Sequence, residues 1–275
     1  MGEKQWVVGT DIGGTFTDVI CINMETGEQR LGKVASTPPT FFDGVINGLK
    51  RAGISGDEVL SFRHGATVST NAILERKGVQ TALITTEGFR DVLGGGRAER
   101  ISAFELDWDP PEIIIPRRNV MPVRERVGPY GDVLTEINEE DVLLAARKCK
   151  KRGIESIAVV YMDSFMNPVH ELRTREILAK ELPDVDVTLS HEVLPQMLEF
   201  ERTCTTVLNA YISPILKNYL GGLAKRLKED WGYDGPLLIT TSGGGVIGMD
   251  EAVKFPAKTF HSSPVSGAVG MAGYI

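Results

Sequence analysis

The sequence contains few residues of the kinds that build metal centres or disulfides. Its 275 residues include three cysteines and four histidines. Cys21, Cys149 and Cys204 are far apart and form no Cys-x-x-Cys pair. Structural zinc sites take their ligands from closely spaced Cys and His residues, so a zinc site built within this chain is not expected. Scattered cysteines in odd number are typical of a reduced protein.

Long apolar runs and an excess of positive charge are also missing. No stretch approaches the roughly 20 apolar residues needed to cross a bilayer. The first residues, MGEKQWVVGT, lack the basic and then apolar pattern of a signal peptide. With 37 acidic and 30 basic residues the net charge is −7, which disfavours binding to nucleic acid or to an anionic membrane. The sequence therefore predicts a cytoplasmic protein without either of these partners.

Strand-like and helix-like patterns alternate along most of the chain. Residues 6–12 and 17–23 have the pattern of two strands joined by a tight turn, which predicts a hairpin. Apolar spacing predicts helices over 38–54 and 138–153. Residues 94–136 are rich in glycine and proline and are expected to be irregular. This alternation predicts an α/β fold.

The segment DIGGTFTD, residues 11–18, contains groups that bind phosphate. Gly13 and Gly14 would let the backbone turn tightly and approach an anion, because they have no Cβ. The amides there and the hydroxyls of Thr15 and Thr17 can donate to phosphate oxygens. Asp11 is placed to hold Mg²⁺ through water, because magnesium gives up its hydration reluctantly. The alternative is a hairpin whose glycines only make the turn.

The hairpin segment 11–18 matches neither of two common nucleotide-binding motifs. It is not a P-loop, because no GxxxxGK[ST] occurs in the sequence, and it is not a GxGxxG fingerprint. Asp18 lies on the outgoing strand, so we expect it to have a structural role or to support the residues that hold the metal.

The hairpin segment GTDIGGTFTDVI resembles the first phosphate-binding hairpin of the actin, sugar-kinase and heat-shock-chaperone ATPase superfamily. Residues 64–93, 165–171, 200–214 and 242–246 narrow the resemblance to the N-terminal part of the hydantoinase A, 5-oxoprolinase and acetone (acetophenone) carboxylase family. The resemblance implies an actin-like α/β ATPase lobe. It also implies a hydantoinase/oxoprolinase N-terminal region over residues 1–190 and the beginning of a hydantoinase A region over 195–275.

The resemblance implies an enzyme that uses ATP and Mg²⁺ to phosphorylate a carbonyl oxygen. Two substrate classes stay open: cyclic amides of the hydantoin or 5-oxoproline type, which are hydrolysed, and ketones of the acetone or acetophenone type, which are carboxylated. Catalysis would consist mostly of positioning and charge neutralisation. The implied partners are other enzyme subunits (hydantoinase B-like) or a C-terminal half. An alternative is a non-catalytic ATP-binding subunit with an assembly or reactivating role.

By the same resemblance, Asp11, Gly13, Gly14, Thr15 and Thr17 would contact the phosphates and the metal. Gly243, Gly244 and Gly245, which follow a predicted strand, would form a turn that contacts the nucleotide.

The stretch 64–71 is predicted to open a helix, where free N–H groups attract an anion. His64, Thr67, Thr70 and Asn71 are therefore candidates to contact the transferred phosphoryl group or the substrate carbonyl. The alternative is a helix-capping segment with a hydrogen-bonded histidine.

Other polar residues carry weaker expectations. Arg90 and Arg97 could neutralise a phosphate or a substrate carboxylate, although loop arginines usually do neither. His170, Glu171 and His191 have no metal-ligand spacing, so we expect a pair on a helix surface and a histidine at a strand end.

Two features depart from the family pattern. Residues 96–111 differ from the sequence pattern that the family usually has at this place, so this loop is expected to touch substrate or a partner. The aromatic residues Phe104 and Trp108 of the loop would suit an apolar ketone. The superfamily uses two phosphate-binding hairpins, and residues 1–275 contain the first of them but not the second. We therefore expect the isolated chain to bind ATP poorly and to be inactive.

Overall fold

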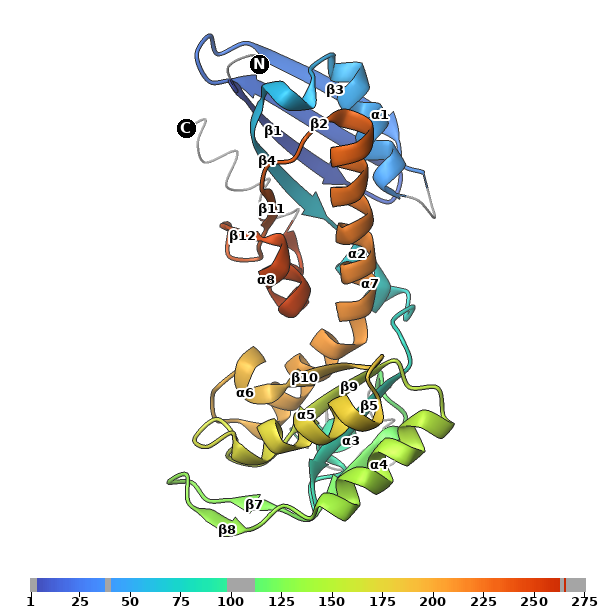
Figure 1. The fold of residues 1–275 in the computed structure, drawn as a ribbon, viewed down its shortest axis with the longest axis vertical. Coiled ribbons are helices and arrows are strands. Elements are labelled where there is room, and N and C mark those ends of the chain that lie inside the picture. The colour runs from blue at the N-terminus through green and yellow to red at the C-terminus, as the bar shows by residue number, and fades with distance from the viewer. Residues whose placement is uncertain (1–3, 38–40, 98–111, 263–264, 266–275) are drawn as a thin grey trace, which may run out of the picture. The chain divides into compact units, whose positions relative to one another are not determined.

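The structure is a computed structural model that describes residues 4–37, 41–97, 112–262 and 265. The chain forms two compact units, drawn in Figure 1. The first unit comprises Met1–Lys77 and Ile215–Ile275, and the second comprises Gly78–Pro214. Among the residues described, no helix combines the length and the apolar character that a membrane span requires.

The first unit is built on a six-stranded sheet with the order β12-β11-β4-β1-β2-β3. Its strands are β1 (Trp6–Ile12), β2 (Phe16–Asn23), β3 (Gln29–Ala35), β4 (Val59–Ala66), β11 (Leu237–Thr240) and β12 (Val246–Gly248). The three central strands β1, β4 and β11 are parallel to one another. The outer strands β2, β3 and β12 each run antiparallel to a neighbour.

Helices pack on one face of this sheet. The helices of the first unit are α1 (Phe41–Ala52), α2 (Val68–Leu74), α8 (Met249–Lys254) and the part of α7 (Glu199–Trp231) from residue 215 onward. Apolar residues of α1 and α7 recur every three or four positions, which places them on one side of each helix. The core formed with the sheet includes Val45, Ile46, Leu49, Leu216, Leu220, Leu223 and Leu227, all buried.

The second unit contains a four-stranded parallel sheet with the order β10-β9-β5-β6. Its strands are β5 (Thr81–Thr86), β6 (Val120–Val123), β9 (Ser156–Val160) and β10 (Asp186–Leu189), with a separate ribbon of β7 (Arg126–Val127) and β8 (Val133–Thr135). Its helices are α3 (Val92–Gly95), α4 (Glu139–Lys151), α5 (Val169–Glu181), α6 (Ser190–Val193) and the first half of α7.

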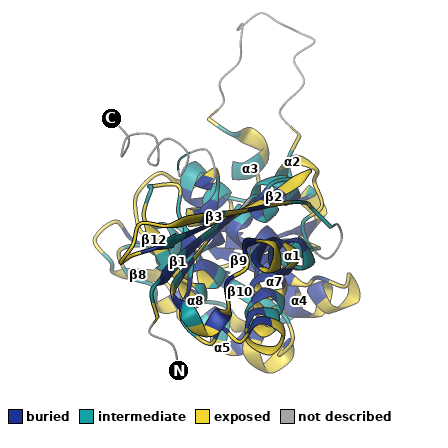
Figure 2. Cartoon of the chain, turned by 90° about the horizontal axis from the view of Figure 1, so that it is seen from above, coloured by how far each residue is buried: buried dark blue, intermediate teal, exposed yellow. Residues whose placement is uncertain are grey.

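Burial in the second unit follows the layers. Every residue of the central strands β5 and β9 is buried, as expected for a parallel sheet covered on both faces. Dark blue and yellow residues alternate along α4 in Figure 2. The buried positions are Val142, Ala145, Ala146 and Cys149, spaced three or four residues apart, so α4 turns one side to the core.

The structure confirms the α/β prediction and the N-terminal hairpin, whose strands run over Trp6–Ile12 and Phe16–Asn23. The expectation that residues 94–136 are irregular is partly wrong, because β6 lies within them. β6 contains Pro122, which cannot donate to a ladder, and it is accommodated because β6 is an edge strand. Residues 98–111, with Phe104 and Trp108, lie outside the described residues.

Candidate phosphate-binding site

Three loops of the first unit meet at one edge of its sheet. Asp11 is paired with Gly65 across β1 and β4, and His64 is paired with Ile239 across β4 and β11. Since these strands are parallel, their carboxyl ends lie together. The loops that follow them are residues 13–15, residue 67 at the start of α2, and residues 241–245. Ligands of open α/β sheets bind outside the carboxyl ends of the strands, so this edge is the candidate site.

The turn after β1 is held by Ser36, a residue that the sequence reading missed. The amide of Gly13 donates to the carbonyl of Phe16 at 2.9 Å, and the hydroxyl of Ser36 donates to the carbonyl of Gly13 at 2.7 Å. The amide of Ser36 donates to the carbonyl of Thr15 at 2.9 Å. Within the described part of the chain, the amides of Gly14 and Thr15 donate to no other group. Two backbone donors are thus exposed at the tip of the turn.

The two glycines of the turn differ in what they do for the fold. Neither has a positive φ, so the turn does not demand glycine for its backbone conformation. A Cβ atom at Gly13 would lie 3.2 Å from the carbonyl oxygen of Phe16, which is a tight contact. A Cβ atom at Gly14 would meet nothing within 4 Å. Gly14 therefore leaves space that the folded chain itself does not use.

Asp11 lies on the face of the sheet opposite α1 and α7, where it is exposed. A Cβ atom at Gly65 would be 3.0 Å from Oδ1 of Asp11 and 3.4 Å from Oγ1 of Thr240, so the carboxylate lies against Gly65. Asp11 lines a groove of about 500 Å³ together with Lys33, Arg63 and others. An exposed carboxylate beside such a groove suits a metal ion that keeps its water shell.

Asp18 sits opposite Asp11 in the hairpin register. Its Oδ1 is 2.8 Å from Nζ of Lys33 on the neighbouring strand β3. Both side chains of this pair are more than half exposed. Asp18 is therefore engaged in a surface ion pair.

Thr17 does not face this site. Strand alternation places it on the core side of the sheet, where its side chain is fully buried. Its hydroxyl lies 3.2 Å from Oγ of Ser36. This position contradicts the expectation that Thr17 contacts phosphate, whereas Thr15 is exposed at the turn.

His64 is also directed into the core rather than toward a ligand. Its Nδ1 is 2.6 Å from Oγ1 of Thr10, and its Nε2 is 2.7 Å from the hydroxyl of Tyr219. Complete burial lowers the pKa of His64 to about 3, so the ring is neutral at pH 7. Burial, with the charge of Asp11, raises the pKa of Tyr219. His64 is thus the hydrogen-bonded histidine of the alternative interpretation.

The start of α2 is joined to the hairpin. The hydroxyl of Thr67 donates to the carbonyl of Ile12 at 2.8 Å, and Nδ2 of Asn71 donates to Oγ1 of Thr67 at 3.4 Å. Oγ1 of Thr70 accepts a hydrogen bond from the amide of His261 at 3.4 Å. These contacts place Thr67 and Asn71 beside the turn and give them a role in fixing its position.

The glycine run forms the turn between β11 and β12. The amide of Thr241 donates to the carbonyl of Gly245 at 2.9 Å, and Gly244 has a φ of 83°, which favours glycine. Gly243 and Gly245 are exposed. The structure therefore brings Gly243, Gly244 and Gly245 to the same edge as Gly13 and Gly14.

The weaker candidates lie in the second unit, and two of them are placed differently from the expectation. His170 and Glu171 are buried rather than on a helix surface. Nδ1 of His170 is 2.7 Å from Oε2 of Glu125, and burial raises the pKa of Glu125. No group of metal ligands occurs among the described residues. Arg90 donates to the carbonyl of Arg117, and Arg97 pairs with Glu201.

Glu171 is the centre of a buried cluster that the sequence reading did not find. Its carboxylate accepts from the hydroxyl of Ser164 at 2.9 Å and lies 2.6 Å from Nδ1 of His191. Nη1 of Arg202 donates to the carbonyl of Tyr161 and to Oγ of Ser190, both at 2.8 Å. Glu171 and Arg202 belong to the stretches 165–171 and 200–214, but no periodicity marks them as buried partners.

Comparison with known proteins identifies the family. The hydantoinase/oxoprolinase N-terminal region matches residues 7–182, and the hydantoinase/oxoprolinase domain matches residues 202–275. The chain is 33% identical to the acetophenone carboxylase gamma subunit of Aromatoleum aromaticum, over 96% of this chain and 38% of the relative.

Two solved structures share the fold. A nucleotide-free structure of acetone carboxylase, from a study of ATP-dependent acetone carboxylation, superimposes with a TM-score of 0.86 at 27% identity, over 98% of this chain and 40% of that one. The ATP-dependent caprolactamase from Pseudomonas jessenii superimposes with a TM-score of 0.79 at 28% identity, over 94% of this chain and 39% of that one. The chain thus spans about two fifths of the length of these proteins, and the predicted fold class is confirmed. The chain belongs to the hydantoinase/oxoprolinase family.

Proposed function

We propose that the chain forms the part of an ATP-dependent enzyme that binds the phosphates of ATP and presents them to a carbonyl substrate. The observation that carries the proposal is the meeting of three loops at the carboxyl ends of β1, β4 and β11, with the exposed carboxylate of Asp11 beside them. Solved relatives described as ATP-dependent share this fold.

The residues at this edge fit a magnesium–nucleotide complex. The amides of Gly14 and Thr15 point to no other described group, and the position of a Cβ at Gly14 is empty. Backbone amides in a turn form concave sites for anions. Asp11 would hold Mg²⁺ through water. ATP would supply the phosphoryl group that converts the carbonyl oxygen into a good leaving group.

Each remaining residue has a distinct part in the proposal. The hydroxyl of Thr15 donates to a phosphate oxygen, and the turn of Gly243, Gly244 and Gly245 approaches the nucleotide from β11. Thr67, Asn71 and Ser36 hold the hairpin in place through their hydrogen bonds. His64 acts as a positioning residue, because it contacts Thr10 directly before Asp11.

The substrate is a carbonyl compound of one of two classes. Relatives include an acetophenone carboxylase subunit and a caprolactamase, which represent ketones and cyclic amides. Since the chain spans about two fifths of such relatives, we infer that further chain segments or other subunits complete the enzyme.

The test is ADP release by the assembly purified through this chain, with hydantoins, lactams and ketones, each with and without bicarbonate. Release that requires a ketone and bicarbonate would assign a carboxylase. Release with a cyclic amide alone would assign a ring-opening hydrolase. Absence of release with every compound would contradict the proposal and favour an ATP-binding assembly subunit.

A further inference from the structure

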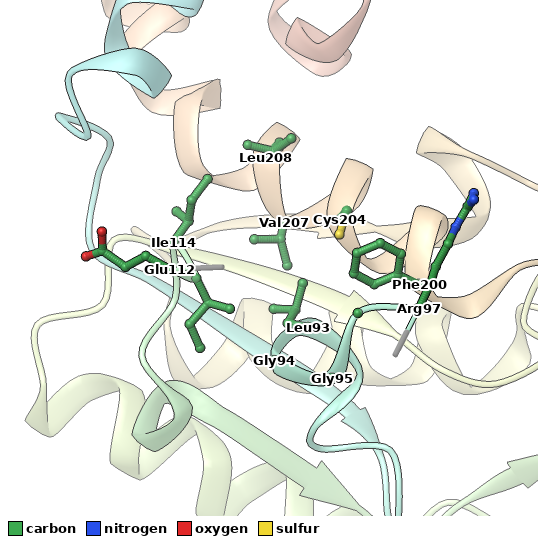
Figure 3. A pocket seen from close by; sticks show the side chains of 12 residues that line it. Leu93, Gly94, Gly95, Arg97, Glu112, Ile114, Phe200, Cys204, Val207 and Leu208 are labelled. Carbon is green, nitrogen blue, oxygen red and sulfur yellow. The ribbon is translucent and has the colours of Figure 1, made fainter. Parts of the chain in front are cut away.

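The second unit contains a pocket of about 380 Å³ that the proposed phosphate site does not use. Short helix α3, the chain at residues 112–114 and the first turns of α7 enclose it, as Figure 3 shows. Among the described residues, those that line it belong to the second unit. Pockets that bind small molecules commonly measure roughly 300 to 1,000 Å³.

The walls of the pocket are almost wholly apolar. Leu93, Ile114, Phe200, Val207 and Leu208 extend toward one another in Figure 3. The charged ends of the two ionic lining residues, at opposite edges, point away from this group in the same view. Burying a charge in such surroundings is costly, because no opposite charge compensates for the lost water. The pocket therefore suits a neutral molecule.

The polar group that lies among the apolar side chains is also neutral. Cys204 lies between the apolar side chains on α7. Burial raises the pKa of its thiol to about 11, so the thiol keeps its proton at pH 7. A protonated thiol is a weak hydrogen-bond donor, which matches the carbonyl oxygen of a neutral ligand better than an anion.

Two glycines on the pocket wall have room for a side chain. A Cβ atom at Gly94 or at Gly95 would meet nothing within 4 Å. Both residues line the pocket and neither has a positive φ. The backbone would thus accept a side chain at either position, so both positions can be used to probe the pocket by substitution.

The α7 wall is fixed from behind. Arg202 lies between Phe200 and Cys204 in sequence, but it is directed into the buried cluster, where it donates to Tyr161 and Ser190. Val207 belongs to the core that also contains Leu83. The pocket is therefore preformed, and a ligand would not have to bear the cost of ordering its wall.

We propose that this pocket binds the apolar body of a neutral carbonyl compound, a ring-sized ketone or lactam, in preference to a polar hydantoin ring. A dry apolar cavity of about 150 Å³ accepts benzene, so the volume here is sufficient for a ring and its substituents. The carbonyl chemistry of the ligand rests on the proposed function. Its size and lack of charge rest on the pocket alone.

The test is ligand binding to the full chain without nucleotide. Acetophenone, ε-caprolactam and hydantoin are titrated by ligand-observed NMR, and their effect on the modification rate of Cys204 by a disulfide reagent is measured at pH 9. Cys21 and Cys149 are buried, so Cys204 is the thiol that reacts first. Acetophenone and ε-caprolactam should bind and slow the modification at least fivefold, and hydantoin should do neither.

Substitutions assign the binding to the pocket. Gly94→Leu and Gly95→Leu should each weaken binding of acetophenone at least tenfold. Gly221→Leu is the matched control, because Gly221 is an exposed glycine of α7 whose Cβ would also meet nothing within 4 Å. It should bind like the parent. Circular dichroism of all three variants shows whether each is folded. One folded variant of the two pocket glycines is sufficient for the test.

The outcomes separate this inference from the proposed function. Unchanged binding in a folded Gly94→Leu or Gly95→Leu variant, or no binding of either apolar probe, would overturn the pocket assignment even if the assembly releases ADP. Binding that depends on the pocket supports the assignment even if no ADP is released, and the proposed function would then fail alone.

Discussion

The carboxylate of Asp11 lies against the backbone of Gly65, on the parallel strand beside it. The two residues are paired in register, and a Cβ atom at Gly65 would come within 3.0 Å of Oδ1. Glycine at this position is therefore what gives the carboxylate its place at the end of β1. In the proposed function that carboxylate holds the magnesium ion.

Replacing Gly65 by alanine should displace this carboxylate. We expect Gly65→Ala to weaken Mg²⁺-ATP binding by the assembly about tenfold, equivalent to about 1.4 kcal/mol, while the fold is kept. Isothermal titration with Mg²⁺-ATP measures the change. Gly9→Ala is the control, since its Cβ would lie 3.2 Å from a methyl carbon of Ile20 instead of a carboxylate. Equal affinities of Gly65→Ala and Gly9→Ala would contradict the role given to Asp11.

His64 should make the stability of the chain depend on pH. Its folded-state pKa of about 3 is well below the value of about 6.5 in an unfolded chain. The unfolded state therefore binds the extra proton, and the contribution of His64 is complete above pH 6.5 and is lost as the pH falls toward 3. Between pH 7 and pH 5 the loss is about 2 kcal/mol.

Urea unfolding of the parent and of His64→Gln at both pH values measures this contribution. Glutamine keeps a polar group beside Thr10 and Tyr219 but does not titrate. The free energy of unfolding should fall less with pH in His64→Gln than in the parent. Identical pH dependence in the two proteins would show that His64 is accessible to protons in the folded chain.

The buried cluster of the second unit should be sensitive to loss of one charge. Arg202→Met removes the buried guanidinium that is linked to the carboxylate of Glu171 through the hydroxyls of Ser164 and Ser190. We expect a loss of about 3 to 5 kcal/mol in the free energy of unfolding, because a buried charge loses its compensating neighbour. Arg175→Met removes the partly exposed pair with Glu192 and should cost less than about 1 kcal/mol.

The double variant Arg202→Met/Glu171→Gln should be more stable than the sum of its single variants predicts, because it leaves no unpaired charge. Denaturant unfolding of the parent, Arg202→Met, Glu171→Gln and the double variant gives this coupling energy. Additive effects would mean that the guanidinium and the carboxylate do not stabilise one another.

Local patterns in the sequence predicted the hairpin and the main helices well. Alternating residues in Trp6–Ile12 and the three- and four-residue spacing in Glu139–Lys151 are local properties, and the structure has both elements at nearly the expected positions. The expected phosphate turn is likewise a local segment with a distinctive composition. These features can be found without knowing what packs against them.

The side-chain environments were harder to predict. Thr17 and His64 look like ligands because they belong to polar segments, but strand alternation directs both into the core. His64 is satisfied by Tyr219, 155 residues away in sequence. Glu171 and Arg202 similarly depend on partners from several elements. Such pairings are set by tertiary packing, and one sequence carries no periodic signal for them.

The central claim is that the turn at Gly13 and Gly14 receives the phosphates of ATP, and Gly14→Ala tests it most directly. The added methyl group meets no atom of the folded chain within 4 Å, so thermal stability should be unchanged or slightly higher. If phosphate binds at the turn, the assembly carrying Gly14→Ala should bind Mg²⁺-ATP at least about tenfold more weakly. Parent-like affinity in a folded Gly14→Ala assembly would contradict the claim.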